Sequence, residues 1–227
     1  MVLDRPTSLR PTPLVVAGIA SLANGAALLL YILGRLPLPL LLAVTWTIAA
    51  IAVATMGALG DAANRARLKR FVLIGLAAGL VATPAYDVTK AILSQLDPSP
   101  FDPFATTHVF GEILIGTSAP PILISIVGWA FHLANGCTFA IAFACLFARG
   151  GRISVRRGVL TGMIWGLFLE TFQLALYPGW LSIKFLDEFR QISFLAHVVF
   201  GASLGLLVPA GLRWSERRVS RPTRGAR

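Results

Sequence analysis

Four side chains that can carry charge lie inside long apolar stretches of this sequence, namely Asp87, His132, Glu170 and His197. A charge at the centre of a membrane helix costs about 2.5–3.5 kcal/mol on insertion scales, so each of these residues needs a partner or a role. Carboxylates and imidazoles transfer protons, bind polar ligands and hold metal ions. The chemistry that these residue types predict is therefore polar binding, proton transfer or metal ligation within a membrane.

Each of the four residues shares a helical face with small or polar residues. In the third apolar stretch, Gly75, Gly79 and Thr83 precede Asp87 in steps of four. Residues three and four apart lie on one face of a helix, and two glycines at this spacing let helix backbones approach closely in lipid. The other three faces hold Ser125, Trp129, His132, Asn135 and Phe139; Gly162, Gly166, Glu170, Gln173 and Tyr177; and Ser193, His197, Gly201 and Gly205.

This pattern predicts that the third, fifth and sixth apolar helices meet through their glycines and carry a polar pocket above that contact. The expected lining is Asp87, His132, Asn135, Glu170, Gln173 and His197. For Asp87 the alternative is an ion pair with Lys90, three residues on, whereas Glu170 has no basic residue three or four positions away. For the two histidines the alternative is a neutral imidazole hydrogen-bonded between helices.

A metal site is a second interpretation of the same residues. His132, Glu170 and His197 have suitable ligand types, and His108 and Glu112 could add two more from the segment before the fourth apolar stretch. The spacing matches no specific metal motif. Axial ligation of a haem by the two histidines is disfavoured because their expected depths differ by several ångströms. The sequence therefore identifies no cofactor.

The elements that must position these residues are six apolar stretches, each near the roughly 20 residues that a membrane helix needs. They lie at about 14–33, 38–59, 71–93, 121–147, 158–177 and 192–212. Hydrophobic residues make up 56% of the 227 residues and charged residues only 13%, whereas soluble domains carry about 25% charged residues. We therefore predict an all-α polytopic transmembrane bundle of six spans, a single membrane domain over 1–227, with a peripheral hairpin at 14–59 and a four-helix core at 71–212.

The basic residues predict the orientation. The net charge is +10, and sixteen of the 20 lysines and arginines fall in the N-terminal segment, the links at 60–70 and 148–157, and the tail at 213–227. An excess of this kind marks the cytoplasmic side, so both termini are expected inside and the basic tail with them. No nucleic-acid-binding pattern accompanies the charge, so we expect the lipid bilayer and not nucleic acid as partner. The segment 94–120 is then external, with a short helix at about 106–115.

The stretch 71–212 resembles small bacterial inner-membrane proteins of the YagU-like kind. The resemblance rests on the run from Phe71 to Thr83, on the Pro-rich external segment, and on the histidines in Phe131-His132-Leu133-Ala134 and Phe194-Leu195-Ala196-His197. It covers about 60% of the chain and implies a location in the bacterial cytoplasmic membrane and a loose link to acid tolerance. It implies no catalytic residues.

Several function classes remain compatible with the sequence. The first is a pocket open to the outer side that binds a small molecule, a lipid, a cofactor or a partner subunit. The second is a membrane enzyme whose histidine and carboxylate act on a lipid or isoprenoid, and the third is a structural or assembly subunit of a membrane complex. A proton-coupled transporter ranks lower, because the inner half of the expected bundle lacks a polar path.

Overall fold

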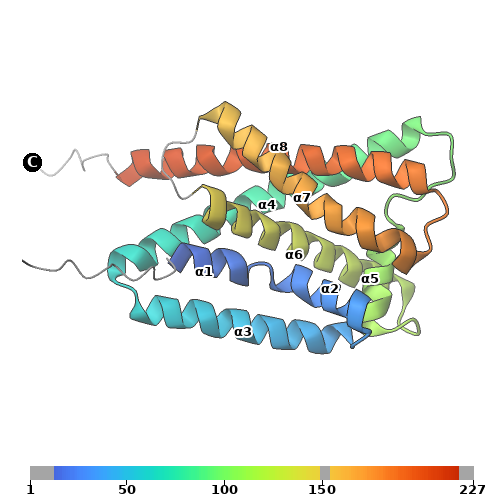
Figure 1. The fold of residues 1–227 in the computed structure, drawn as a ribbon, viewed down its shortest axis with the longest axis horizontal. Helices are drawn as coiled ribbons and strands as arrows, with labels where there is room; N and C mark the ends of the chain where they lie inside the picture. The colour runs from blue at the N-terminus through green and yellow to red at the C-terminus, as the bar shows by residue number, and fades with distance from the viewer. Residues whose placement is uncertain (1–12, 149–153, 220–227) are drawn as a thin grey trace, which may run out of the picture.

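The computed structural model describes residues 13–148 and 154–219, and within these two ranges every regular element is a helix (Figure 1). The helices are α1 (Pro13–Ala20), α2 (Ala23–Gly34), α3 (Leu38–Leu59), α4 (Ala62–Leu96), α5 (Ala105–Ile115), α6 (Pro121–Phe147), α7 (Val155–Leu181) and α8 (Leu186–Val219). Six helical stretches are long and apolar enough to cross a membrane, with α1 and α2 together forming the first. The predicted all-helical chain with six membrane-length spans is confirmed.

The spans differ from the prediction mainly at their polar ends. The third begins at Ala62, well before residue 71, because the Asp61 carboxylate caps the helix by accepting a hydrogen bond from Asn64 N at 2.7 Å. The first is interrupted at Ser21 and Leu22, where the Ser21 hydroxyl donates to the Ala17 carbonyl oxygen at 2.8 Å. Hydropathy marks where a helix enters lipid, and not where its hydrogen bonds end.

The bundle has a core of four long helices with a hairpin on one flank (Figure 1). α4 packs along both α6 and α8, and α7 packs along α8 but makes few contacts with α6. α1 and α2 pack on α3, and α1 also contacts α6, so that α3 lies at the edge of the molecule (Figure 1). α5 lies across one end of the bundle against α6.

Glycines set the closest helix contacts. A Cβ atom added at Gly162 would collide with the Gly201 carbonyl oxygen, and one at Gly158 with the Gly205 carbonyl oxygen, so α7 and α8 touch through their backbones. The glycines of α4 do not join this contact. A Cβ atom at Gly79 would lie 2.6 Å from Cys137 Cα of α6. The expectation of one glycine contact shared by the third, fifth and sixth spans is wrong, because the α4 glycines face α6.

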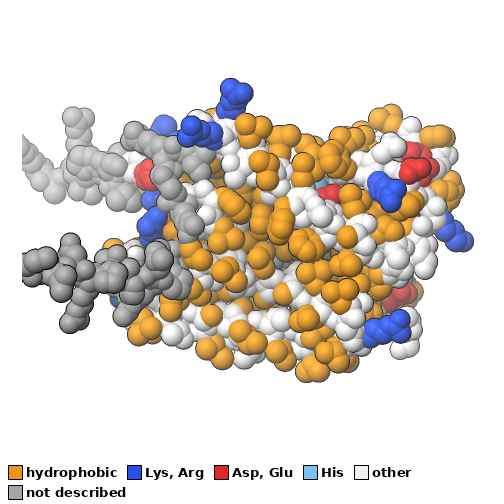
Figure 2. Space-filling view, in the orientation of Figure 1, with side chains coloured by type: hydrophobic (Ala, Val, Ile, Leu, Met, Phe, Trp, Pro, Cys, Tyr) orange, Lys and Arg blue, Asp and Glu red, His pale blue; other side chains and the backbone are white. Residues whose placement is uncertain are grey.

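The two ends of the bundle differ in charge. α1 begins and α8 ends at the same end as the α3–α4 turn (Figure 1). We call this the basic end; its described lysines and arginines near helix termini include Arg65, Arg67, Lys69, Arg70, Arg156, Arg157, Arg213 and Arg217. Apolar side chains cover much of the flank between the ends (Figure 2). Residues 1–12, 149–153 and 220–227, which hold Arg5, Arg10, Arg149, Arg152 and most of the predicted basic tail, lie outside the described residues.

Candidate functional site

α5 is fixed against α6 by two glycines. A Cβ atom at Gly128 would collide with the Thr107 carbonyl oxygen, and one at Gly111 with the Ile124 carbonyl oxygen. This close contact, at the end opposite the basic end, brings Thr107 and Phe110 of α5 over the space between the long helices. The helix predicted at about 106–115 is therefore present as α5, and it forms part of the site.

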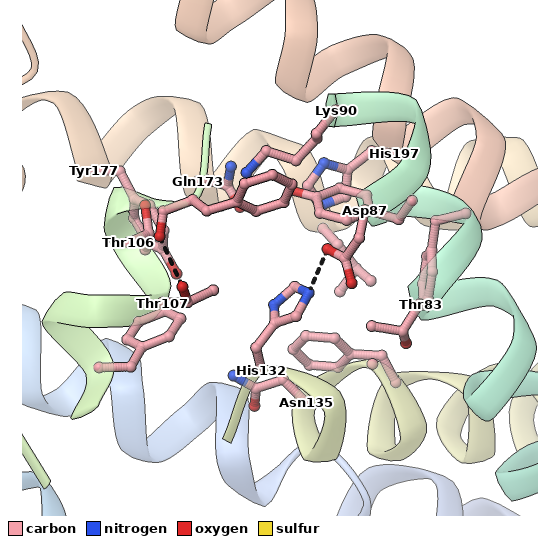
Figure 3. Close-up of a pocket in the computed structure, with 17 residues that line it drawn as sticks. Thr83, Asp87, Lys90, Thr106, Thr107, His132, Asn135, Gln173, Tyr177 and His197 are labelled. Atoms are coloured by element: carbon pink, nitrogen blue, oxygen red, sulfur yellow. Dashed lines mark hydrogen bonds and ion pairs between the residues drawn. The ribbon is translucent and has the colours of Figure 1, made fainter. Parts of the chain in front are cut away.

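A polar cavity of about 90 Å³ lies beneath α5, between α4, α6, α7 and α8 (Figure 3). Five of the six predicted lining residues line it: Asp87, His132, Asn135, Gln173 and His197. The sixth, Glu170, is only 1% exposed and lies behind His197, in the interface between α7 and α8. Residues from four separate helices thus meet around one small space.

The first histidine–carboxylate pair joins α6 to α4. His132 Nε2 lies 2.9 Å from Asp87 Oδ1, within hydrogen-bond distance (Figure 3). Both side chains are partly exposed, His132 by 18% and Asp87 by 19%. The alternative ion pair between Asp87 and Lys90 is not formed, because Lys90 makes no ion pair with any described residue.

The second pair joins α8 to α7 and is more deeply buried. His197 Nδ1 lies 2.7 Å from Glu170 Oε2 and 3.0 Å from the Ser193 carbonyl oxygen. A carbonyl oxygen can only accept, so Nδ1 carries a proton and Nε2 is the remaining nitrogen of the ring. The Ser193 hydroxyl donates to Glu170 Oε2 at 2.9 Å, and the Gln173 amide donates to Ser193 Oγ at 2.6 Å. These bonds orient His197 within a closed network.

An aromatic ring separates the two pairs. The Tyr86 ring centroid lies 5.8 Å from that of His132 and 4.9 Å from that of His197. Lys90 Nζ lies 5.3 Å from the Tyr86 ring and 5.5 Å from the Phe104 ring, near enough for cation–π contacts. The sequence reading did not include Tyr86 or Lys90 in the pocket. A signal for Lys90 was present, since it is the only lysine or arginine between residues 71 and 93.

The structure does not bring the predicted metal ligands together. Among residues 13–148 and 154–219, no group of three or more histidine, cysteine, aspartate or glutamate side chains is placed to hold a metal ion. His132 pairs with Asp87, whereas Glu170 pairs with His197. His108 and Glu112 lie 3.5 Å apart on α5 and pair with each other. The two histidine–carboxylate pairs, His132–Asp87 and His197–Glu170, are thus separate, and the Tyr86 ring lies between them.

An apolar crevice of about 270 Å³ adjoins the polar cavity on the side of α2. It lies between α2, α6 and α7, where α7 makes few contacts with α6. The residues common to the crevice and the cavity are Asn135, Phe139, Leu169, Gln173, Tyr177 and His197. Two other lining side chains, Phe168 and Phe172, are 48% and 41% exposed, so the crevice reaches the flank of the bundle. The polar cavity therefore lies directly beside an apolar crevice that opens on the flank of the bundle.

Two polar atoms at the cavity have no hydrogen-bond partner among the described residues. They are Thr83 Oγ1 and Asn135 Oδ1, on side chains of residues that are 3% and 9% exposed. Glu170 Oε1 in the adjoining network is also unpartnered. Buried polar groups are almost always hydrogen-bonded, so these three atoms are exceptions in the protein interior beside the cavity.

Comparison with protein families, with characterised proteins and with solved structures finds no match for this chain. The resemblance to YagU-like proteins stays a prediction. What the protein does must therefore be argued from the geometry of the cavity and the crevice.

Proposed function

We propose that this protein binds an amphiphilic molecule drawn from the membrane, with its polar group in the cavity and its hydrocarbon part in the crevice. The observation that carries the proposal is that the two spaces adjoin, because Gln173, Asn135 and His197 border both. A ligand that dissolves in the bilayer can enter between α2 and α7 without crossing water. The polar side chains that the sequence identified then serve recognition.

The sizes of the two spaces support an amphiphile over a compact small molecule. Ligand pockets usually measure about 300–1,000 Å³. The polar cavity, at about 90 Å³, is far below that range, and the crevice, at about 270 Å³, approaches it. The cavity therefore suits a small head group, while the larger, apolar crevice suits a chain.

We place the protein in the cytoplasmic membrane of a bacterium, with the basic end and both termini on the cytoplasmic side. The excess of lysine and arginine at the basic end supports this orientation. The cavity beneath α5 then lies toward the outer face, within reach of lipids of the outer leaflet. A partner subunit is not required for this role.

A second candidate function is chemistry on the bound lipid. The observation that favours it is the His197–Glu170 pair, in which the carboxylate and the Ser193 carbonyl hold Nδ1 while Nε2 makes no hydrogen bond within the described residues. A histidine oriented in this way can act as a general base. Incubation with a radiolabelled lipid extract, followed by chromatography, separates the two functions: new labelled products support an enzyme.

The test of the proposed function blocks the crevice without touching a polar group. Ala26 lies on α2 in the crevice wall, so Ala26→Phe would place a ring where the chain is expected. Ala50 is a lipid-facing alanine on α3 outside the crevice, and Ala50→Phe is the matched control. We expect lipid that co-purifies in mild detergent, measured by native mass spectrometry, to be lost from Ala26→Phe and retained by Ala50→Phe. Equal retention by both variants would overturn the proposal.

A further inference from the structure

Lys90 is the only lysine or arginine among the described residues that line the polar cavity. The residue is 8% exposed and makes no ion pair within the described parts of the chain. Its ammonium group lies near the faces of Tyr86 and Phe104, at 5.3 and 5.5 Å. A cation in a membrane interior is costly unless a counter-charge or water accompanies it, so an anion in the cavity would stabilise it.

The carboxylates of the site are already engaged. Asp87 is paired with His132 at 2.9 Å, and Glu170 with His197 at 2.7 Å. Each of these carboxylates therefore has an imidazole as its partner, and neither forms an ion pair with Lys90. No carboxylate among the described residues contacts the Lys90 ammonium directly.

Two residues that line this space carry a buried polar atom without a hydrogen-bond partner. Asn135 borders both the cavity and the crevice, and Thr83 lines the cavity from α4 (Figure 3). The Thr83 hydroxyl can donate a hydrogen bond, and so can the Asn135 amide nitrogen. Neither Thr83 Oγ1 nor Asn135 Oδ1 has a partner among the described residues. An oxyanion in the cavity could accept hydrogen bonds from the Asn135 amide nitrogen and from the Lys90 ammonium.

We propose that the ligand is a single-chain anionic amphiphile, whose carboxylate or monophosphate group lies beside Lys90 while its hydrocarbon chain leaves through the crevice between α2 and α7. This rests on the proposed function and specifies its ligand class. A single chain is favoured because the crevice measures only about 270 Å³. The carboxylate and the phosphate share one chemistry, an oxyanion that accepts several hydrogen bonds.

The experiment compares four probes with the same chain and different head groups. The full-length protein in mild detergent is incubated with radiolabelled hexadecanoate, and hexadecyl phosphate, hexadecanol and hexadecyltrimethylammonium are added as competitors. We expect hexadecanoate or hexadecyl phosphate to bind at least about tenfold more tightly than hexadecanol, and the cationic probe to compete least. The tighter of the two anions identifies the head group as a carboxylate or a phosphate.

Variants of Lys90 connect the preference to this residue. Lys90→Gln removes the charge, Lys90→Arg keeps it, and Lys184→Gln removes an exposed charge at the same end of the bundle, outside the cavity. We expect Lys90→Gln to weaken hexadecanoate binding about tenfold with little change for hexadecanol. Lys90→Arg and Lys184→Gln should bind nearly as the unaltered protein does. Because the probe series is measured on the unaltered protein as well, the proposal is tested even if Lys90→Gln does not fold.

The outcomes separate this proposal from the function on which it rests. If hexadecanol competes as well as the anionic probes, the ligand class is wrong although the crevice still binds amphiphiles. The same holds if Lys90→Gln and Lys184→Gln behave alike. If no probe with this chain binds the unaltered protein, the proposed function itself is contradicted.

Discussion

The two sides of α7 differ in how they meet the rest of the bundle. On one side, Gly158, Gly162 and Gly166 bring its backbone against α8, so closely that no side chain fits between the helices. On the other side, Phe168 and Phe172 stand half exposed beside the crevice, and contacts with α6 are few. The same helix is thus sealed along α8 and open toward α6 and α2.

The difference indicates that one side of α7 holds the bundle together, while the other side borders the crevice. Small residues give a rigid seam because two backbones in contact leave no freedom to rearrange. Large side chains at the facing surface prevent such a contact and leave space at the level of the polar groups. The contact between α7 and α8 positions Glu170, Gln173 and His197, and under the proposed function the open side gives a ligand access to Gln173 and His197.

The largest expected effect on the free energy of unfolding is at the glycine contact between α7 and α8, which is the rigid seam. Gly162→Ala would place a methyl group against the Gly201 carbonyl oxygen, so the helices must separate. We expect the free energy of unfolding to fall by about 3 kcal/mol, the upper end of the usual cost of overpacking. Denaturation with sodium dodecyl sulfate, followed by circular dichroism, measures it. Gly179→Ala is the control, because a Cβ atom there meets nothing within 4 Å; similar losses in both variants would show that the seam is not rigid.

An intermediate effect distinguishes the two histidine–carboxylate pairs. Glu170→Ala leaves the buried Ser193 hydroxyl without its acceptor and His197 Nδ1 with the Ser193 carbonyl oxygen alone, and we expect a loss of about 2 kcal/mol in unfolding free energy. Asp87→Ala removes a partner from the partly exposed His132, which can turn to the cavity, and about 1 kcal/mol is expected. The same denaturation series measures both. A larger loss of unfolding free energy for Asp87→Ala than for Glu170→Ala would show that the His132–Asp87 pair, and not the His197–Glu170 pair, stabilises the bundle more.

The smallest effect is expected on the open side. Phe172 is 41% exposed at the crevice, so Phe172→Ala should change the free energy of unfolding by less than about 1 kcal/mol, far less than truncation of a core phenylalanine. Its effect should instead be seen as weaker binding of the amphiphile. If Phe172→Ala unfolds the protein as readily as Gly162→Ala, the open side is structural after all.

Much of the fold could be predicted because hydropathy alone identifies membrane helices. The spans at 38–59 and 121–147 were predicted to the residue, since sharp polar or proline boundaries flank them. The stretch at 71–93 was too short, because α4 continues through charged residues that water can solvate. Apolar content cannot locate the end of a helix beyond the membrane.

The candidate site was only partly predictable, because helical spacing defines a face but not the helix that it meets. Gly75 and Gly79 have the same spacing as Gly162 and Gly166, yet the first two face α6 and the other two face α8. For the same reason the sequence could not tell that Asp87 pairs with His132 on another helix and not with Lys90 on its own. Pairings between helices depend on the packing of the whole bundle.

The most direct test of the account is photo-crosslinking with a hexadecanoate that carries a diazirine group on its chain. Irradiation of the protein with this probe, digestion and mass spectrometry locate the labelled residues. The account predicts labels on the crevice wall, at Leu22 just before α2, at Leu29 of α2, and at α7 residues such as Phe172 and Leu176, all suppressed by excess unlabelled hexadecanoate. Labels spread evenly over lipid-facing positions of α3, with no suppression by competitor, would contradict it.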